Sequence, residues 1–357
     1  MKRLISLMLA LILAVSMLAS CINEKDIDNI LDATDTEAAK DTSPENDDTD
    51  KETNVTLSKD PVRVFTIKGP TGMGMAPLMK ANDDKTAKLN YNFTVANAAD
   101  EFTGNIVQGE FEIACVPTNL AAVLHSKTNG AIEVAAVNTL GVLYVVEDGN
   151  TINSVYDLEG KTIYSAGQGA VPEYALKYIL DTFGINCEVI YEAEHDVVVA
   201  DIMTNTADVA LLPEPKVTAA LKNEKAPADL RVALDLNDLW AQACEKNGDD
   251  SVLYMGCIIV NKEWANSHQN ELSAFLEEYK NSVDAVNGNP ETASQIIAEY
   301  GIIPKAPLAK AAIPNAKIVF ITGDEMKIGL NGFYEILAKY NPKAIGGSVP
   351  AENIYRK

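Results

Sequence analysis

The feature that most constrains this chain is an alternation of short strand-like runs with helix-like stretches, which begins near residue 61. Runs rich in β-branched and aromatic residues are followed by segments whose apolar residues recur at helical spacing. The strand-like runs of this first series lie at 62–69, 91–96, 111–117 and 132–139. Strands separated by single helices form parallel sheets through right-handed crossovers, so the pattern predicts a doubly wound α/β fold.

The same alternation starts afresh at residue 143, with strand-like runs at 143–147, 161–169, 187–193 and 208–215. An amphipathic helix is predicted over 171–184. It is expected to end at Gly184, because glycine is a typical residue at the C-terminal end of a helix. A strand-like run at 254–264 and long helical segments follow. These late helices need a sheet to cover, and the first series lacks outer helices. The chain is therefore expected to return to the first sheet.

The resulting prediction is two doubly wound lobes joined by a two-strand hinge around a ligand cleft. Lobe I comprises residues 61–142 and 255–357, and lobe II comprises residues 143–254. In open parallel sheets, the loops at the carboxyl ends of the strands bind ligands. Both lobes are expected to direct these loops toward one shared cleft.

The ligand-binding candidates in lobe I follow three of its strand-like runs. Glycines there let the backbone approach a ligand closely, and a tight strand–helix turn is the alternative. Methionines supply apolar wall, with core packing as the alternative. Thr118 also fits a helix N-cap. The lobe I candidates are Thr71, Gly72, Met73, Gly74, Met75, Thr118, Asn119, Asn138 and Thr139.

The candidates in lobe II lie at the ends of two strand-like runs. Ser165, Gln168 and Gly169 precede a predicted helix, which places a hydroxyl, a carboxamide and free backbone amides at a helix N-terminus. Pro172 suits the first helical turn, so part of this motif is helix capping. Glu214 ends another run between two prolines and is predicted at the cleft rim. A solvated carboxylate is the alternative.

The N-terminal residues are typical of an export signal. Two basic residues precede an apolar stretch, 4–18, that is short for a transmembrane helix. The Leu-Ala-Ser-Cys motif at 18–21 resembles the lipobox of bacterial lipoproteins, in which the cysteine thiol is acylated and becomes the new N-terminus. We therefore predict a lipoprotein signal peptide at 1–20 and an exported protein, lipid-anchored through Cys21 to the outer face of the bacterial cytoplasmic membrane. An ordinary secretory signal is the alternative.

The segment after the lipobox is strongly acidic. Residues 22–60 contain 13 Asp or Glu against 4 Lys or Arg. Such a composition buries too little apolar surface to offset the chain entropy of folding. We predict that residues 21–60 form a disordered acidic tether whose charges repel one another and hold the folded part away from the membrane.

The folded part resembles the extracytoplasmic solute-binding lipoproteins of ABC importers, and among them the nitrate/taurine/aliphatic-sulfonate and thiamine-precursor receptor superfamily. The resemblance is carried, in family order, by KGPTGMGMAPLMK, ADEFTGNIVQGEFEIACVPTNLAAVL, NTLGVLYVVE, DLEGKTIYSAGQGAVPEYAL and DVALLPEPKVTAAL. It implies the periplasmic-binding-protein type II fold, a small-molecule ligand, an ABC permease with its ATPase as partners, and a monomer. It also directs Glu214 toward the ligand, although the family often has a neutral residue there.

The scarcity of arginine bears on the ligand. The chain has four arginines, and none lies in a candidate cleft loop. Planar anionic groups such as sulfonates are typically clamped by Arg. With Glu214 and Asp100 near the expected cleft, this favours a neutral or weakly cationic heterocycle such as a thiamine precursor. A sulfonate or taurine-type anion is the alternative, because helix N-termini bind anions without Arg.

The remaining composition excludes several classes of function. The net charge of −22 argues against nucleic acid and against electrostatic binding to anionic lipid. The three histidines do not converge with a nucleophile on the cleft, so the sequence predicts no enzyme, no metal site and no cofactor. An enzyme on the same fold and a sensor lipoprotein without a transporter are the alternatives. Whether Cys244 and Cys257 form a disulfide stays open.

Overall fold

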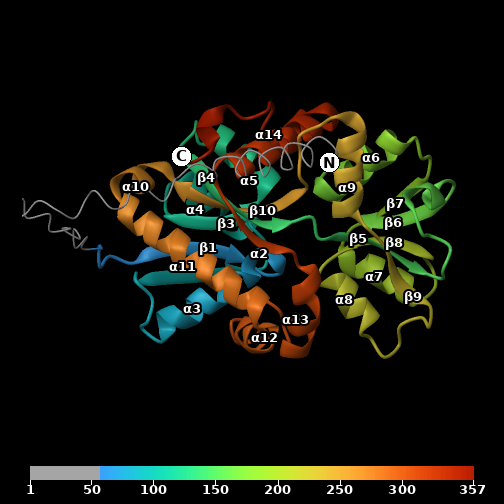
Figure 1. The fold of residues 1–357 in the computed structure, drawn as a ribbon, viewed down its shortest axis with the longest axis horizontal. Helices are drawn as coiled ribbons and strands as arrows, with labels where there is room; N and C mark the ends of the chain where they lie inside the picture. The colour runs from blue at the N-terminus through green and yellow to red at the C-terminus, as the bar shows by residue number, and fades with distance from the viewer. Residues whose placement is uncertain (1–56) are drawn as a thin grey trace, which may run out of the picture. The chain divides into compact units, whose positions relative to one another are not determined.

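The computed structural model describes residues 57–357, and these form two α/β lobes, each built on one sheet (Figure 1). This confirms the predicted two-lobe α/β fold. The predicted signal peptide, Cys21 and the tether as far as residue 56 lie outside the described residues.

Lobe I is built on a six-stranded sheet. Its strands, in spatial order, are β11 (Ile318–Ile321), β4 (Ile132–Leu140), β10 (Tyr254–Asn261), β3 (Ile113–Pro117), β1 (Val62–Ile67) and β2 (Tyr91–Ala96). β1 is parallel to β2 and β3, whereas β10 is antiparallel to both β3 and β4. β10 has the opposite direction because it is the strand on which the chain returns from lobe II. The sequence did not predict β11, whose four residues lie among the late helices.

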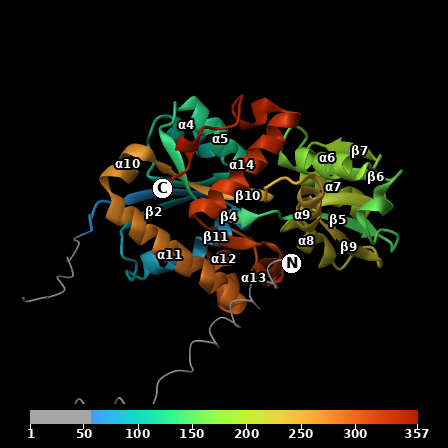
Figure 2. The same cartoon turned by 45° about the horizontal axis from the view of Figure 1, so that its top comes forward.

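The helices of lobe I cover both faces of this sheet. One face packs against α3 (Ala76–Asp83), α11 (Gln269–Gly288), α12 (Pro290–Glu299) and α13 (Ala306–Ala312). The other packs against α4 (Asp100–Val107), α5 (Thr118–Lys127) and α14 (Gly323–Tyr340). The late helices therefore cover the first sheet, as the sequence predicts (Figure 2).

Lobe II is built on a five-stranded sheet. Its strands, in spatial order, are β7 (Glu188–Glu192), β6 (Thr162–Ala166), β8 (Val209–Pro213), β5 (Leu143–Asp148) and β9 (Leu230–Asp235). One face packs against α6 (Val171–Phe183) and α9 (Leu236–Asn247), and the other against α7 (His195–Met203) and α8 (Lys216–Leu221). The helix predicted over 171–184 is α6, and Gly184 ends it in the left-handed conformation at φ 71°.

Several element boundaries differ from those predicted. The strand predicted over 254–264 ends at Asn261, because the Asn261 side chain accepts hydrogen bonds from Glu263 N and Trp264 N and so starts the short helix α10 (Lys262–Ser267). The strand predicted over 161–169 ends at Ala166, because Gly167 takes a φ of 83°. Residues 57–60, predicted to lie in the tether, belong to the fold: Ser58 N donates to Glu271 Oε1 at 2.7 Å.

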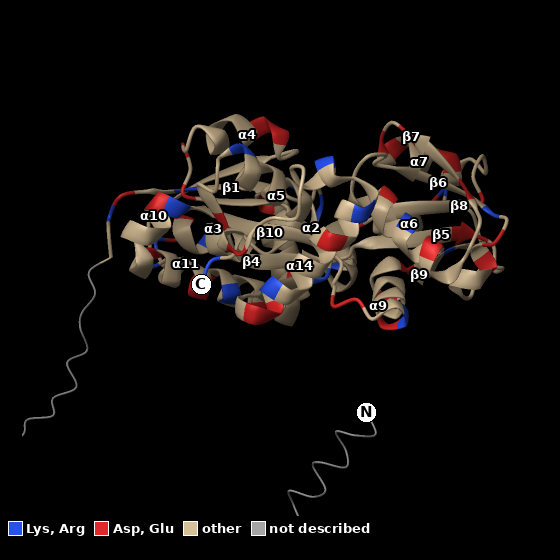
Figure 3. Ribbon diagram, turned by 90° about the horizontal axis from the view of Figure 1, so that it is seen from above, with Lys and Arg blue, Asp and Glu red and all other residues tan. Residues whose placement is uncertain are grey.

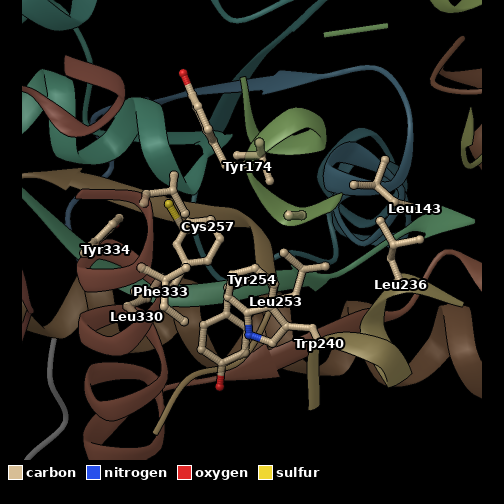
Figure 4. Close-up of a cluster of buried hydrophobic side chains, with 14 of the residues drawn as sticks. Leu143, Tyr174, Leu236, Trp240, Leu253, Tyr254, Cys257, Leu330, Phe333 and Tyr334 are labelled. Atoms are coloured by element: carbon tan, nitrogen blue, oxygen red, sulfur yellow. The ribbon is translucent and has the colours of Figure 1, made fainter. Parts of the chain in front are cut away.

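The chain passes between the lobes twice, from β4 to β5 through Gly141 and from α9 to β10. A continuous apolar cluster spans the lobes beside these two crossings (Figure 4). Within it, the ring centroids of Trp240 on α9 and Phe333 on α14 are 5.8 Å apart, and those of Trp240 and Tyr178 are 4.7 Å apart. The α9–α14 side is therefore joined by core-like packing.

Candidate functional site

The carboxyl ends of strands from both lobes converge on the first crossing. β1, β3 and β4 share one direction, because β10 is antiparallel to β3 and β4. β4 leads into β5, whose first residue, Leu143, pairs with Pro213 at the carboxyl end of β8. β6 and β7 run parallel to β8. Each sheet thus turns its carboxyl edge, the loops that follow these strands, toward the other lobe, where α/β sheets bind ligands.

Three predicted residues of lobe I come together around Gly256, at the start of β10. A Cβ added at Gly256 would lie 2.5 Å from Asn138 Oδ1, 2.8 Å from Thr71 Oγ1 and 2.9 Å from Thr139 Oγ1. Asn138 Nδ2 donates to Thr71 O at 3.2 Å, and Thr139 Oγ1 donates to Asn138 Oδ1 at 3.1 Å. The structure therefore assembles a group of oxygen atoms at this edge, and only a residue without a side chain leaves room for it.

The 72–75 turn is packed into lobe I. A Cβ at Gly72 would overlap the carbonyl oxygen of Ile67, and one at Gly74 would lie 2.7 Å from Tyr279 Oη. Met73 and Met75 are fully buried in the core on the α11 face. These four candidates therefore match the packing alternative, because the atoms that press against them belong to the core of lobe I.

Thr118 and Asn119 face the α14 side of lobe I. Thr118 Oγ1 donates to Tyr254 O at 2.5 Å, and Asn119 Nδ2 donates to Ala344 O at 3.4 Å. The alternative N-cap role of Thr118 is wrong: Pro117 occupies the N-cap of α5, and Thr118 is its first helical residue. Both side chains are committed within lobe I, so they stabilise the β3–α5 junction.

The loop between β6 and α6 presents less free polar surface than expected. Ser165 is fully buried, and its Oγ donates to the neighbouring Ala166 O at 3.2 Å. Gln168 and Gly169 are exposed. The amide of Gly169, predicted to be free, donates to Glu173 Oε2 at 2.5 Å. A carboxylate of the chain therefore already sits at the N-terminus of α6, where the helix dipole favours negative charge.

Glu214 follows β8 directly and is 2% exposed, so the solvated alternative is wrong. Its N donates to Val142 O at 2.9 Å, beside the first crossing. Oε1 accepts a hydrogen bond from Thr218 Oγ1 at 2.9 Å and Oε2 one from Thr218 N at 3.3 Å, and the Asn315 side chain lies near the carboxylate. Burial raises the pKa of Glu214 above its usual value, and these hydrogen bonds oppose that rise. No ion pair within residues 57–357 includes Glu214.

Five basic side chains of the described part lie away from the carboxyl edge or are already paired. Its three arginines pair with carboxylates away from the carboxyl edge: Arg63 with Glu112, Arg231 with Glu147 and Arg356 with Glu133. At the edge itself, Lys216 pairs with Asp196 and Lys317 with Asp235. Lys68, after β1, is exposed. Acidic residues occur on both lobes (Figure 3), and the candidate cleft loops of residues 57–357 contain no arginine.

Sequence reasoning missed four residues of this region. Gly256 and Asn315 are far from the candidates in sequence and reach them only through the antiparallel entry of β10 and the path into β11. Tyr144, whose hydroxyl donates to Asn315 O at 2.8 Å, resembles any buried strand residue. Glu173 had a readable signal, since a Glu in the first turn of a helix commonly bonds back to the preceding amides.

Two of the histidines in the part of the chain from 57 onward make local contacts. His125 Nδ1 bonds to Ile132 O at 2.8 Å, and His268 stacks on Trp264 with ring centroids 5.6 Å apart. No group of three His, Cys, Asp or Glu side chains in this part is suited to a metal ion. Its cysteines, Cys244 and Cys257 included, are free thiols. No helix of residues 57–357 has the length and apolarity needed to span a membrane.

Two α/β lobes whose strand ends converge on a shared, polar, buried edge define a two-lobe ligand-binding protein. A family model described as "ABC transporter, phosphonate, periplasmic substrate-binding protein" matches residues 75–311, and the chain belongs to this family. It is thus a substrate-binding protein of an ABC transporter, and the family implies export and a small-molecule ligand.

Solved structures share the fold. An ABC transporter protein from Parabacteroides distasonis aligns with a TM-score of 0.68 at 22% identity, covering 83% of this chain and 98% of the other. The periplasmic aliphatic sulphonate binding protein of Escherichia coli aligns with a TM-score of 0.66 at 12% identity, covering 84% and 93%. A zinc-bound ligand-binding component of an import system from Staphylococcus aureus has a TM-score of 0.59 at 13% identity, covering 84% and 97%. No curated protein sequence matches this chain.

Proposed function

We propose that this protein is a solute-binding lipoprotein that captures a small organic ligand between its lobes and delivers it to an ABC permease driven by its ATPase. The motif at 18–21 supports acylation of Cys21, and the acidic segment that follows supports a tether to the outer face of the cytoplasmic membrane. The protein acts as a monomer, held near its importer by the lipid.

The ligand is a neutral or weakly cationic heterocycle, such as a thiamine precursor. Glu214 carries this part of the proposal. A buried carboxylate without a basic partner is stabilised by additional hydrogen-bond donors. Ring N–H and amino groups of a pyrimidine supply such donors, and a protonated ring nitrogen supplies a compensating charge as well.

Two further observations support this ligand class over an anion. The arginines of the described residues are engaged away from the carboxyl edge. Glu173 occupies the Gly169 amide at the N-terminus of α6, so a second negative group there meets a like charge.

A sulfonate, taurine-type or phosphonate ligand is the second candidate. The family description and the sulphonate-binding neighbour favour it, and the buried hydroxyl of Ser165 beside the N-terminus of the 13-residue helix α6 is compatible with an anion. A transport-independent sensor or an enzyme on this fold are further alternatives. A permease and ATPase gene pair beside the coding sequence separates import from sensing.

Ligand entry requires the lobes to separate. Glu214 of lobe II is 2% exposed and lies near Asn315 of lobe I, so a solute reaches it only when the carboxyl edges move apart. The lobes then rotate about the two crossings, and the ligand stabilises the closed arrangement by touching both lobes.

A thermal-shift screen tests this proposal. The panel contains pyrimidines, thiamine, riboflavin, taurine, alkanesulfonates and alkylphosphonates, each followed by calorimetric titration. A ligand present at a hundredfold its Kd stabilises the folded state by about 2.7 kcal/mol, which raises Tm by roughly 5 °C for a chain of this size. Stabilisation by pyrimidines or thiamine supports the assignment. Stabilisation by sulfonates or phosphonates alone contradicts the ligand class and leaves the receptor function intact.

A further inference from the structure

The segment that leads into β11 touches lobe II at points outside the two crossings. This segment, residues 315–317, starts at the last residue of the short 3-10 helix η2 (Ile313–Asn315) of lobe I. Asn315 O accepts a hydrogen bond from Tyr144 Oη at 2.8 Å, and Tyr144 is 4% exposed. Lys317 Nζ lies 2.6 Å from Asp235 Oδ2, with the two side chains 19% and 21% exposed. Both contacts are therefore largely shielded from water.

Lys317 is bound from two directions at once. Its carbonyl oxygen accepts a hydrogen bond from Leu140 N at 3.2 Å, at the last residue of β4 before the first crossing. Its ammonium group reaches the last residue of β9, in lobe II. Lys317 also adopts a φ of 44°, a region that lysine rarely occupies. A residue keeps such a conformation only where its surroundings enforce it, so this position is tightly determined by both of its partners.

The partner of Lys317 is itself connected to the first crossing. Asp235 is the N-cap of α9, and its Oδ1 accepts a hydrogen bond from Asn237 N at 2.8 Å. Asn237 Oδ1 in turn accepts one from Gly141 N at 3.3 Å. Hydrogen bonds therefore connect Asp235 to the backbone that joins the lobes.

We propose that residues 315–317 form an interlobe strap that holds the lobes in the closed arrangement. The strap binds lobe II through Tyr144 and Asp235, and its Asn315 side chain lies near Glu214. Separation of the carboxyl edges breaks these contacts. The strap therefore sets how often the empty receptor opens. This inference rests on the hinge closure proposed above and does not depend on which solute binds.

Hydrogen–deuterium exchange of the ligand-free full chain tests the strap. The variants are Lys317→Met, which removes the ammonium group, and Tyr144→Phe, which removes the hydroxyl and keeps the ring. Lys310→Met is the matched control, because Lys310 forms an ion pair with Glu291 inside lobe I. Loss of an interlobe contact should speed amide exchange at 136–145 and 210–218 roughly two- to fivefold. Exchange within α11 should stay unchanged, and the control should match the wild type throughout.

Three outcomes decide the question. Faster exchange confined to the carboxyl-edge peptides in both strap variants supports the strap. Unchanged exchange at those peptides overturns it. An equal rise in α11 also overturns it, because that pattern reports general loss of stability. The exchange experiment uses no ligand, so its result can be interpreted even if the ligand screen finds no binder.

Discussion

Replacing Glu214 with Gln tests the ligand assignment at its central residue. Gln keeps the size of the side chain and removes the negative charge. Hydrogen bonds to charged groups contribute about 1.5–3 kcal/mol, so losing one from the ligand weakens binding roughly 10- to 100-fold. The measurement is isothermal titration of the wild type and the variant with a solute found in the screen. A donor-rich heterocycle is expected to lose affinity.

Although Glu214→Gln should weaken solute binding, it should not destabilise the ligand-free protein at neutral to mildly alkaline pH. The pKa of Glu214 is raised in the folded state above the ordinary value of 4.5, so the folded state binds this proton more tightly than the unfolded state. The free energy of unfolding of the wild type therefore falls as pH rises from 4.5 through the raised pKa, by about 1.4 kcal/mol for each pH unit between the unfolded and folded pKa values. Glu214→Gln removes this fall and should be at least as stable as the wild type at about pH 8.

A buried carboxylate elsewhere provides the control. Glu271 is 8% exposed and accepts a hydrogen bond from Ser58 N in lobe I. Glu271→Gln should leave solute affinity unchanged. If Glu214→Gln binds the heterocycle as tightly as the wild type, the role assigned to Glu214 is refuted. If the variant is less stable than the wild type at about pH 8, the reasoning about its unpaired charge is refuted as well.

Three further substitutions probe other parts of the site. Gly256→Ala places a methyl group against three oxygen atoms, so we expect a loss of about 1–3 kcal/mol of stability in chemical denaturation and weaker solute binding. Gly288→Ala, at a helical position with open space, should lower neither stability nor solute binding. Trp240→Ala empties the interlobe cluster and should lower the free energy of unfolding by about 3–5 kcal/mol, and a smaller loss would show that its contact with Phe333 is loosely packed. Glu173→Gln removes the carboxylate from the N-terminus of α6, so methylphosphonate affinity should rise by calorimetry, and an unchanged affinity would contradict the like-charge argument.

The sequence predicted the architecture because each lobe has a local pattern of its own. Strand-like runs, helical spacing and stops such as Gly184 are visible within windows of about 15 residues. The switch between lobes also left a trace, since the alternation restarts at residue 143, the first residue of β5. β11 was not predicted, because four residues are too few to show the alternation typical of a strand.

The candidate site was less readable, because it depends on register between distant strands. Asn138 and Thr139 were found as strand-end polar residues, but Gly256 joins them only through the pairing of β10 with β4. The glycines at 72 and 74, by contrast, were predicted from the sequence to lie against a ligand. Their spacing suits close approach to a ligand, yet the tight approach in the structure is to Ile67 and Tyr279. A sequence shows that a close approach exists, whereas only packing shows what approaches.

The two sides of the lobe interface differ in how readily they separate. On the α9–α14 side, opening would withdraw Trp240 from Phe333 in a continuous apolar cluster, and emptying such a position costs about 3–5 kcal/mol. On the strap side, opening parts α13 from α8 and exchanges a few polar contacts for water, each polar contact worth about 1 kcal/mol net. The lobes should therefore pivot on the apolar cluster and part at the strap. Glu214 lies on the side that parts, because the Asn315 side chain is near it, so opening at the strap would uncover the carboxylate assigned to the ligand.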